Sequence, residues 1–158
     1  MTTSRYAEDM KRAIAVLAVL SCSLASAQTV AELLTVTAIQ STLDKTLTIR
    51  LPTGTSFVSN RAYADKLAPS LLAAESPKFG EYQLFVARGY ATRLADAYVA
   101  NLKTSFAASG FMESASRTVK VGADTWTRTD FANDEGRPMA LFVTKRADGV
   151  YFLTATGK

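Results

Sequence analysis

The carboxylates that follow the only tryptophan come closest, in type and spacing, to a chemical site. Asp130, Asp134 and Glu135 all lie in the stretch DFANDEG, residues 130–136. Carboxylate oxygens are the ligands that Ca²⁺ prefers, but this stretch lacks the Asp/Asn spacing of an EF-hand loop. Acidic residues beside a glycine are usual in plain turns. The sequence therefore predicts a solvated turn, with no metal and no cofactor.

The lack of histidine and the single cysteine exclude several catalytic mechanisms for this chain. It has no histidine, and its single cysteine is Cys22. Ser–His–Asp and Cys–His catalysis need a histidine as base, and soft metal sites need histidine or cysteine ligands. A carboxylate pair or a Ser–Lys pair remains, and neither occurs at a diagnostic spacing. We expect no catalytic residue and no enzyme, with a carboxylate or Ser/Lys enzyme as a minor alternative.

The N-terminal residues predict export. Lys11 and Arg12 precede an apolar run, and the small residues Ala25-Ser26-Ala27 follow it, as in a secretory signal peptide. We expect residues 1–27 to form this signal, with Met10 as an alternative start. Residues 28–158 then form a single globular domain, located in the periplasm or cell envelope.

Two other fates of the N-terminal segment remain open. The run Val19-Leu20-Ser21-Cys22 loosely resembles a lipoprotein signal, in which Cys22 would carry a lipid anchor. Retention as a membrane span is disfavoured, because the apolar run is short of the roughly 20 residues that cross a bilayer.

Composition is that of an ordinary globular protein. Hydrophobic residues make up 48% and charged residues 20% of the 158 positions, and the net charge is +4. A domain of this size buries a core without disulfides. Because the positive charges form no cluster along the chain, we expect no nucleic-acid partner.

Hydrophobic periodicity predicts mixed helices and strands. Apolar and polar residues alternate over 45–52, which predicts a strand. Residues 59–80 begin as a helix that Pro69 breaks or kinks. Residues 82–87 predict a short strand. Residues 28–45 are ambiguous between strand and short helix. From residue 114 onward the period is two, which predicts four antiparallel strands at 114–121, 122–131, 139–145 and 150–156, with a tight turn at Asp148-Gly149.

Residues 89–111 give the clearest helix. Tyr90, Leu94, Tyr98, Leu102 and Phe106 recur at intervals of four, which indicates one buried face. The strands MALFV and VYFL are apolar at consecutive positions, which indicates cover on both faces. We therefore predict an α+β fold with a mainly antiparallel sheet and helices on both faces, a three-layer α/β/α sandwich.

Trp126 leaves three interpretations open. Its strand face carries Asp124, Trp126, Arg128 and Asp130, and neither face of the strand is clearly apolar. The ring packs on the layer beneath while Asp124 and Arg128 reach solvent, or it forms an exposed contact with a partner, or it lines a ligand cleft. An exposed tryptophan among charges has the composition of an interface hot spot, so Trp126, Arg128 and Asp124 are the candidate partner-binding residues.

The order of elements and several local residues resemble the PsbP/Mog1-like fold, including the DcrB-type bacterial envelope proteins. The resemblance covers roughly residues 46–157, and the residues that carry it are Gly122, Trp126, Phe142, Gly149, Tyr151, Leu153, Thr154 and Gly157. It implies a non-enzymatic module that binds or stabilises a larger assembly, and it offers no family-wide catalytic residue.

Two functions follow as hypotheses. The first is an exported binding or accessory subunit of an envelope protein complex, with membrane association only through a lipidated Cys22 or a partner. The second is a carrier of a small apolar or amphipathic ligand between helix and sheet. That carrier needs a cleft, for which Tyr98, Leu102, Phe142 and Phe152 are the candidate walls.

Overall fold

The computed structural model describes residues 32–90 and 93–158. The predicted signal peptide, the alternative start at Met10 and the candidate lipid site at Cys22 lie outside these residues. The described chain is a mixed α+β domain with a large antiparallel sheet and two α-helices. Neither of these two helices is long and apolar enough to cross a membrane.

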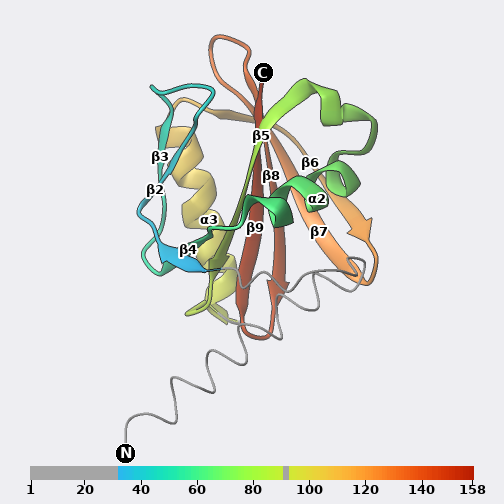
Figure 1. Cartoon of the computed structure of the whole chain (residues 1–158). Helices are drawn as coiled ribbons and strands as arrows, with labels where there is room; N and C mark the ends of the chain where they lie inside the picture. The colour runs from blue at the N-terminus through green and yellow to red at the C-terminus, as the bar shows by residue number, and fades with distance from the viewer. Residues whose placement is uncertain (1–31, 91–92) are drawn as a thin grey trace, which may run out of the picture. The chain divides into compact units, whose positions relative to one another are not determined.

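The large sheet has seven strands in the order β1-β4-β5-β9-β8-β7-β6, and each neighbouring pair is antiparallel (Figure 1). A second sheet pairs β2 with β3. The strand bounds are β1 Leu33–Thr35, β2 Ala38–Gln40, β3 Thr48–Arg50, β4 Thr55–Val58, β5 Phe79–Ala87, β6 Met112–Val121, β7 Asp124–Ala132, β8 Pro138–Arg146 and β9 Gly149–Gly157.

The antiparallel meander of the second half is confirmed. Strands β6 to β9 pair in chain order, and β9 is buried at every position, as its continuous apolar run predicts. The hairpin turn between β8 and β9 requires a glycine at its end. Gly149 has φ +154°, and a Cβ atom there would lie 2.5 Å from the carbonyl oxygen of Ala87.

The long helix α3 spans Arg93–Ala108 and buries Ala95, Tyr98, Leu102 and Phe106. The prediction was wrong for Leu94, whose exposed fraction is 55%. An interval of four residues advances 400° around a helix, so a strict i+4 series drifts by about 40° at each step. Leu94 therefore lies too far around the helix from Leu102, and Ala95 takes its place on the buried face.

Helix α2 spans Arg61–Leu72 and continues into the 3₁₀ helix η1, Ala73–Lys78. Asn60 caps the N-terminus of this helix: its side-chain oxygen accepts a hydrogen bond from the N–H of Ala62. The helix does not end at Pro69 but runs three residues further, to Leu72. The residue after its end is the C-cap Ala73, whose φ of 51° is left-handed.

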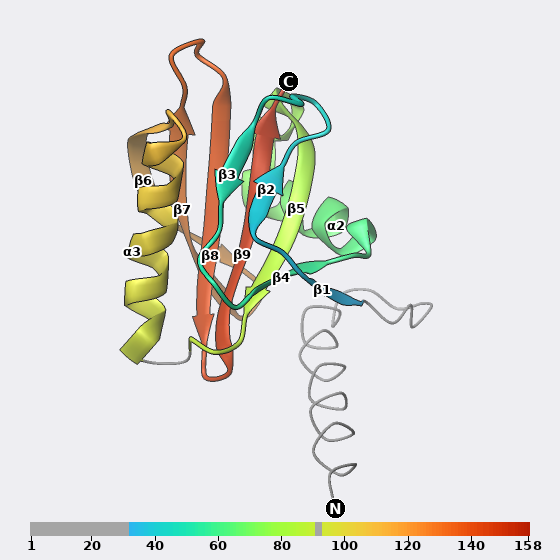
Figure 2. The ribbon, with the colours of Figure 1, turned by 90° about the vertical axis from the view of Figure 1, so that its left-hand side faces the viewer.

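One core lies between the large sheet and the layer that contains α3 and the β2–β3 hairpin (Figure 2). Ile39 and Ile49 of the hairpin, Tyr98 of α3, and Phe85 and Phe152 of the sheet are all buried in it. The rings of Phe85 and Phe152 stack with centroids 4.8 Å apart. Helix α2 packs mainly against β5, with further contacts to β6 and β9.

A candidate pocket between the β2–β3 hairpin and strand β5

An open pocket of about 360 Å³ lies beside the β2–β3 hairpin. Strand β5 supplies alternate residues to it, which is the spacing of side chains on one face of a strand. The chain around β2, the end of β4 and the first residue of α2 complete the wall. The lining residues are Val36, Ala38, Gln40, Thr42, Phe57, Ser59, Arg61, Glu81, Gln83 and Phe85.

The polar end of the pocket is built around Glu81, whose exposed fraction is only 4%. Its carboxylate accepts hydrogen bonds from the Ser41 hydroxyl at 2.6 Å, from the Thr42 hydroxyl at 2.8 Å and from the Thr42 N–H at 3.0 Å. Burial by itself raises the pKa of Glu81, but these hydrogen bonds outweigh burial and hold the pKa below its ordinary value. Glu81 is therefore an ionised anchor that ties the chain after β2 to β5.

Arg61 stands at the rim of this polar end. One guanidinium nitrogen, Nη2, lies 3.1 Å from Glu81 Oε1, and the side chain is 52% exposed. The structure gives the other guanidinium nitrogens no partner among the described residues. A guanidinium has five N–H donors in a planar fork, so Arg61 keeps donors for a ligand while Glu81 holds it in place.

The opposite end of the pocket is apolar. Val36, Ala38, Phe57 and Phe85 line it, and the rings of Phe57 and Phe85 lie 5.6 Å apart. Glu81 and Phe85 are four residues apart on one strand, a separation of about 13 Å at the rise of an antiparallel strand. Polarity therefore falls along the pocket from Arg61 and Glu81 to Phe57 and Phe85. Gln83 lies between the two ends, and its side-chain amide donates to the carbonyl of Gln40 at 2.7 Å.

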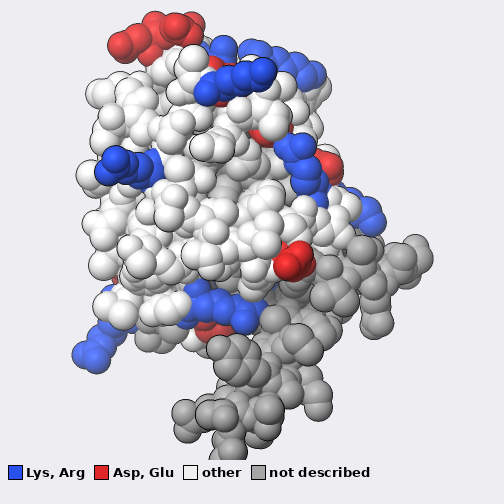
Figure 3. All heavy atoms as spheres, turned by 60° about the vertical axis from the view of Figure 1, so that its left-hand side comes forward, with Lys and Arg blue, Asp and Glu red and all other residues white. Residues whose placement is uncertain are grey.

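The surface on this side of the molecule carries little charge. Figure 3 looks toward the side of α3 and the hairpin, where Lys, Arg, Asp and Glu are sparse over the middle of the face and more frequent near its rim. A ligand that approaches this side meets a mostly uncharged surface, with Arg61 as the half-exposed cation of the pocket wall.

The four predicted cleft residues do not line this pocket. Tyr98, Leu102, Phe142 and Phe152 each have an exposed fraction of 0%. Tyr98, Leu102 and Phe152 belong to the packed core between α3 and the sheet. Burial raises the pKa of Tyr98 to about 12, and its hydroxyl shares a hydrogen bond of 2.6 Å with Thr55. These side chains are packed in the interior and do not line a cleft. The prediction of these four residues as cleft walls was therefore wrong.

Trp126 is a core residue, with an exposed fraction of 0%. Of the three interpretations, the exposed contact is therefore contradicted. Strand β7 is second from the sheet edge, and β6 pairs beside it with Val119 opposite Trp126. The indole N–H finds no hydrogen-bond acceptor among the described residues. Asp124 is partly exposed and bound to Arg146 at 2.7 Å.

Arg128 is also buried, against the prediction that it reaches solvent; its side chain is only 3% exposed. Glu75 of η1 compensates its charge through two hydrogen bonds, at 3.1 and 2.9 Å, and Asp130 accepts a third at 2.7 Å. The guanidinium carbon lies 5.5 Å from the centre of the Phe142 ring. Charges are rarely buried without partners, and strand periodicity alone does not reveal that a distant helix supplies one.

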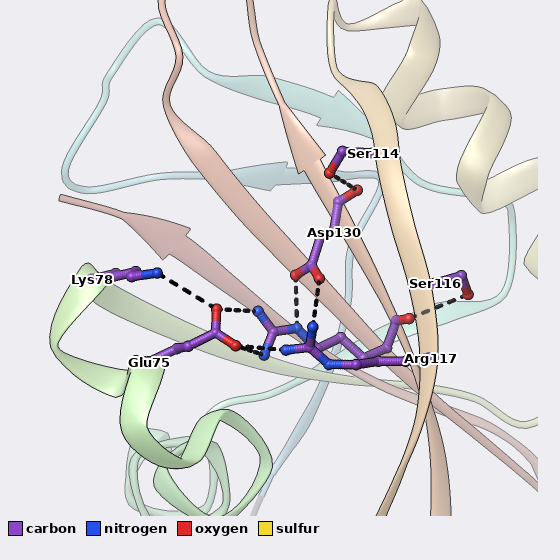
Figure 4. A network of polar contacts seen from close by, with 7 residues as sticks. Glu75, Lys78, Ser114, Ser116, Arg117 and Asp130 are labelled. Atoms are coloured by element: carbon purple, nitrogen blue, oxygen red, sulfur yellow. Dashed lines mark hydrogen bonds and ion pairs between the residues drawn. The ribbon is translucent and has the colours of Figure 1, made fainter.

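The same carboxylate of Glu75 binds Arg117 of β6 at 2.6 Å, and Figure 4 shows Glu75 between Lys78, Arg117 and the strands. Hydrogen bonds from Arg128 and Arg117 hold the pKa of Glu75 below its ordinary value. Asp130 also lies in this network, 3.7 Å from Arg117. It is therefore engaged in ion pairs, while Asp134 and Glu135 are exposed in the turn between β7 and β8. The described residues contain no cluster of acidic residues or cysteine that is arranged to hold a metal.

Glu81 was missed at the level of sequence because the strand was predicted to begin at residue 82, and Arg61 because it was read only as part of the helix predicted within residues 59–80. Extending the predicted strand by one residue includes Glu81 and places it on the same face as Gln83 and Phe85. A carboxylate in an otherwise apolar strand was the available signal. Its partners, Ser41 and Thr42, lie about forty positions away, and no local pattern connects them.

No protein-family model, curated protein or solved structure matches this chain. The resemblance to PsbP/Mog1-like proteins therefore stays a prediction.

Proposed function

We propose that this protein is a non-enzymatic binding protein of the cell envelope that holds a small amphipathic molecule in the pocket beside β5. The observation that carries the proposal is the gradient along this pocket, from Arg61 and Glu81 to Phe57 and Phe85. Ligand pockets typically enclose about 300–1,000 Å³ and combine an apolar lining with a few placed polar groups. The ligand class is an apolar body with an acceptor-bearing head that faces Arg61.

The state of Glu81 supports binding over catalysis. A general acid or base needs a proton to exchange at working pH. The pKa of Glu81 is lowered, and its oxygens are occupied by Ser41, Thr42 and Arg61. In this arrangement Glu81 holds Arg61 and the chain after β2 in place. The pocket wall is therefore already formed before the ligand binds.

Decanoate is a suitable probe for this pocket. We expect binding to the wild-type protein by isothermal titration, and an affinity at least about tenfold lower for Ala38→Trp, which fills the apolar end. Tenfold corresponds to about 1.4 kcal/mol. Thr48→Trp is the matched control, because Thr48 is exposed on the same hairpin and does not line the pocket. Equal binding by Ala38→Trp and wild type, or no binding by either, contradicts the proposal.

An accessory subunit of an envelope complex is the second candidate function. It is favoured by the outer face of α3, where Leu94 and the small residues Ala97, Ala100, Thr104 and Ala107 are exposed. In-cell cross-linking of tagged protein tests it. We expect Ala100→Glu to lose a partner that both the wild type and Thr48→Glu capture. Identical capture by all three proteins removes the α3 face as the contact.

The finer arrangement that we propose is a three-layer α/β/α sandwich of PsbP/Mog1-like type. Its support is that α3 contacts β3, β6 and β9 while α2 contacts β5, β6 and β9, and that β8 and β9 are buried along most of their length on both faces. An experimental structure in which α2 and α3 lie on the same face of the sheet contradicts this arrangement.

A further inference from the structure

The two edges of the large sheet differ greatly in length. Strand β1 has three residues, whereas β6 has ten and pairs only with β7 among the described strands. All ten residues of β6 are exposed or half-buried. An edge strand presents unpaired N–H and C=O groups that are a template for another strand. Strand β6 is therefore the long, accessible edge of this sheet.

The side chains of β6 divide into two sets by their partners on β7. Ala115, Arg117, Val119 and Val121 lie opposite Asp130, Arg128, Trp126 and Asp124. Ser116, Thr118 and Lys120 lie opposite Thr129, Thr127 and Thr125. A β-bulge between Glu113 and Ala115 interrupts the register, so the regular run of the strand is 115–121.

We propose that β6 pairs with β6 of a second copy of this chain, antiparallel and about a two-fold axis at Thr118. The other free edge, β1, offers only three residues to a head-to-tail contact, while a β6–β6 contact is closed and uses the same surface twice. When the two-fold axis is perpendicular to the sheet, the same face of the sheet points in the same direction in both copies. Opposed residues must therefore belong to the same set.

The register about Thr118 uses the whole regular run. It opposes Thr118 to Thr118, Arg117 to Val119, Ser116 to Lys120 and Ala115 to Val121, so no like charges face each other. A register about Arg117 opposes two arginines, and like charges directly opposite are destabilising. A register about Val119 shortens the run to 117–121. Arg117 is in addition neutralised within its own chain by Glu75 and Asp130.

Disulfide trapping tests this register in the full chain. Cys22→Ser is included in each variant so that the introduced thiol is the only one. Opposed residues in an antiparallel pair have Cα atoms about 4.5–5.5 Å apart, within the range for a disulfide. We expect Thr118→Cys to form a disulfide-linked dimer under mild oxidation. Ser116→Cys is the matched control on the same face, because the two copies of residue 116 lie about 14 Å apart in this register. Equal cross-linking by both variants, or none by Thr118→Cys, overturns the proposal.

Sedimentation velocity gives a second readout that needs no covalent bond. The wild type is expected to dimerise with increasing concentration. Thr118→Asp places two carboxylates opposite each other and is expected to weaken the dimer at least about tenfold. Ser116→Asp faces Lys120 of the other copy and is expected to retain it. Both positions are exposed, so both variants should fold. A wild type that stays monomeric to about 100 µM overturns the proposal and leaves the edge for a strand of a different protein.

Discussion

At the scale of single residues, Glu81 gives the sharpest expectation. Glutamine at this position presents an amide to the donors of Ser41, Thr42 and Arg61, so we expect Glu81→Gln to lower the free energy of unfolding by about 2–3 kcal/mol at pH 7. In the wild type the pKa of Glu81 is lower in the folded protein than its ordinary value of 4.5. Between these two values the unfolded chain binds more protons, so acid destabilises the wild type. The difference between wild type and variant should therefore close as the pH falls through the folded pKa.

Urea denaturation from pH 7 to about pH 3 measures this difference. Asp65→Asn is the control, because Asp65 is exposed on α2 and a surface substitution of this kind changes stability by about 0.5 kcal/mol or less. A Glu81→Gln deficit that stays constant down to the lowest pH contradicts the role assigned to the ionised carboxylate.

The residues of the candidate site were the least predictable part of the molecule. Alternation correctly placed Trp126 and Arg128 on one face of β7, but alternation does not say what lies on that face. Arg128 is buried because Glu75, fifty-three positions earlier, brings a carboxylate to it. Glu81 is buried because Ser41 and Thr42 supply its donors. Such pairings depend on tertiary contacts, and a single sequence does not contain them.

At the scale of elements, local patterns were far more informative. The alternation of Leu47, Ile49 and Leu51 is confirmed by their burial around β3, and the continuous apolar runs are confirmed by the burial of β8 and β9. Errors occurred where a second effect competes with the pattern. Helix α2 continues past Pro69 although proline lacks an N–H donor, and the Pro69 carbonyl still accepts a bond from the N–H of Ala73. The ambiguous segment 28–45 contributes β1 and β2, each only three residues long.

Short strands explain how the pocket arises. Strand β4 pairs with β5 only from Phe85 to Ala87, whereas β9 pairs with β5 from Phe79 to Ala87. After Val58 the chain leaves the sheet, and α2 begins at Arg61. The half of β5 that contains Glu81 and Gln83 therefore has no strand neighbour on the side of β4 among the described residues, and the pocket lies along this half.

At the scale of the whole molecule, the sequence predicted a mixed α+β fold with a mainly antiparallel sheet, including the antiparallel second half. It did not predict that β5 joins this meander through β9. That pairing brings together residues about seventy positions apart, for which neither propensity nor periodicity gives a signal. It also places the sheet edges at β1 and β6, on which the proposed contact between copies depends.

Export is the last expectation, and it concerns the chain as a whole. Residues 28–158 contain no cysteine, so the domain needs no disulfide and is compatible with an oxidising compartment. We expect the full chain, produced in a bacterial host, to be recovered from the envelope fraction with an intact mass that begins at Gln28. Cys22→Ser should be processed in the same way, because cleavage after Ala27 removes this residue. If the intact mass instead shows a lipid attached to Cys22, and the uncleaved precursor of Cys22→Ser accumulates, the protein carries a lipid anchor. An intact mass that retains residues 1–27 contradicts both fates.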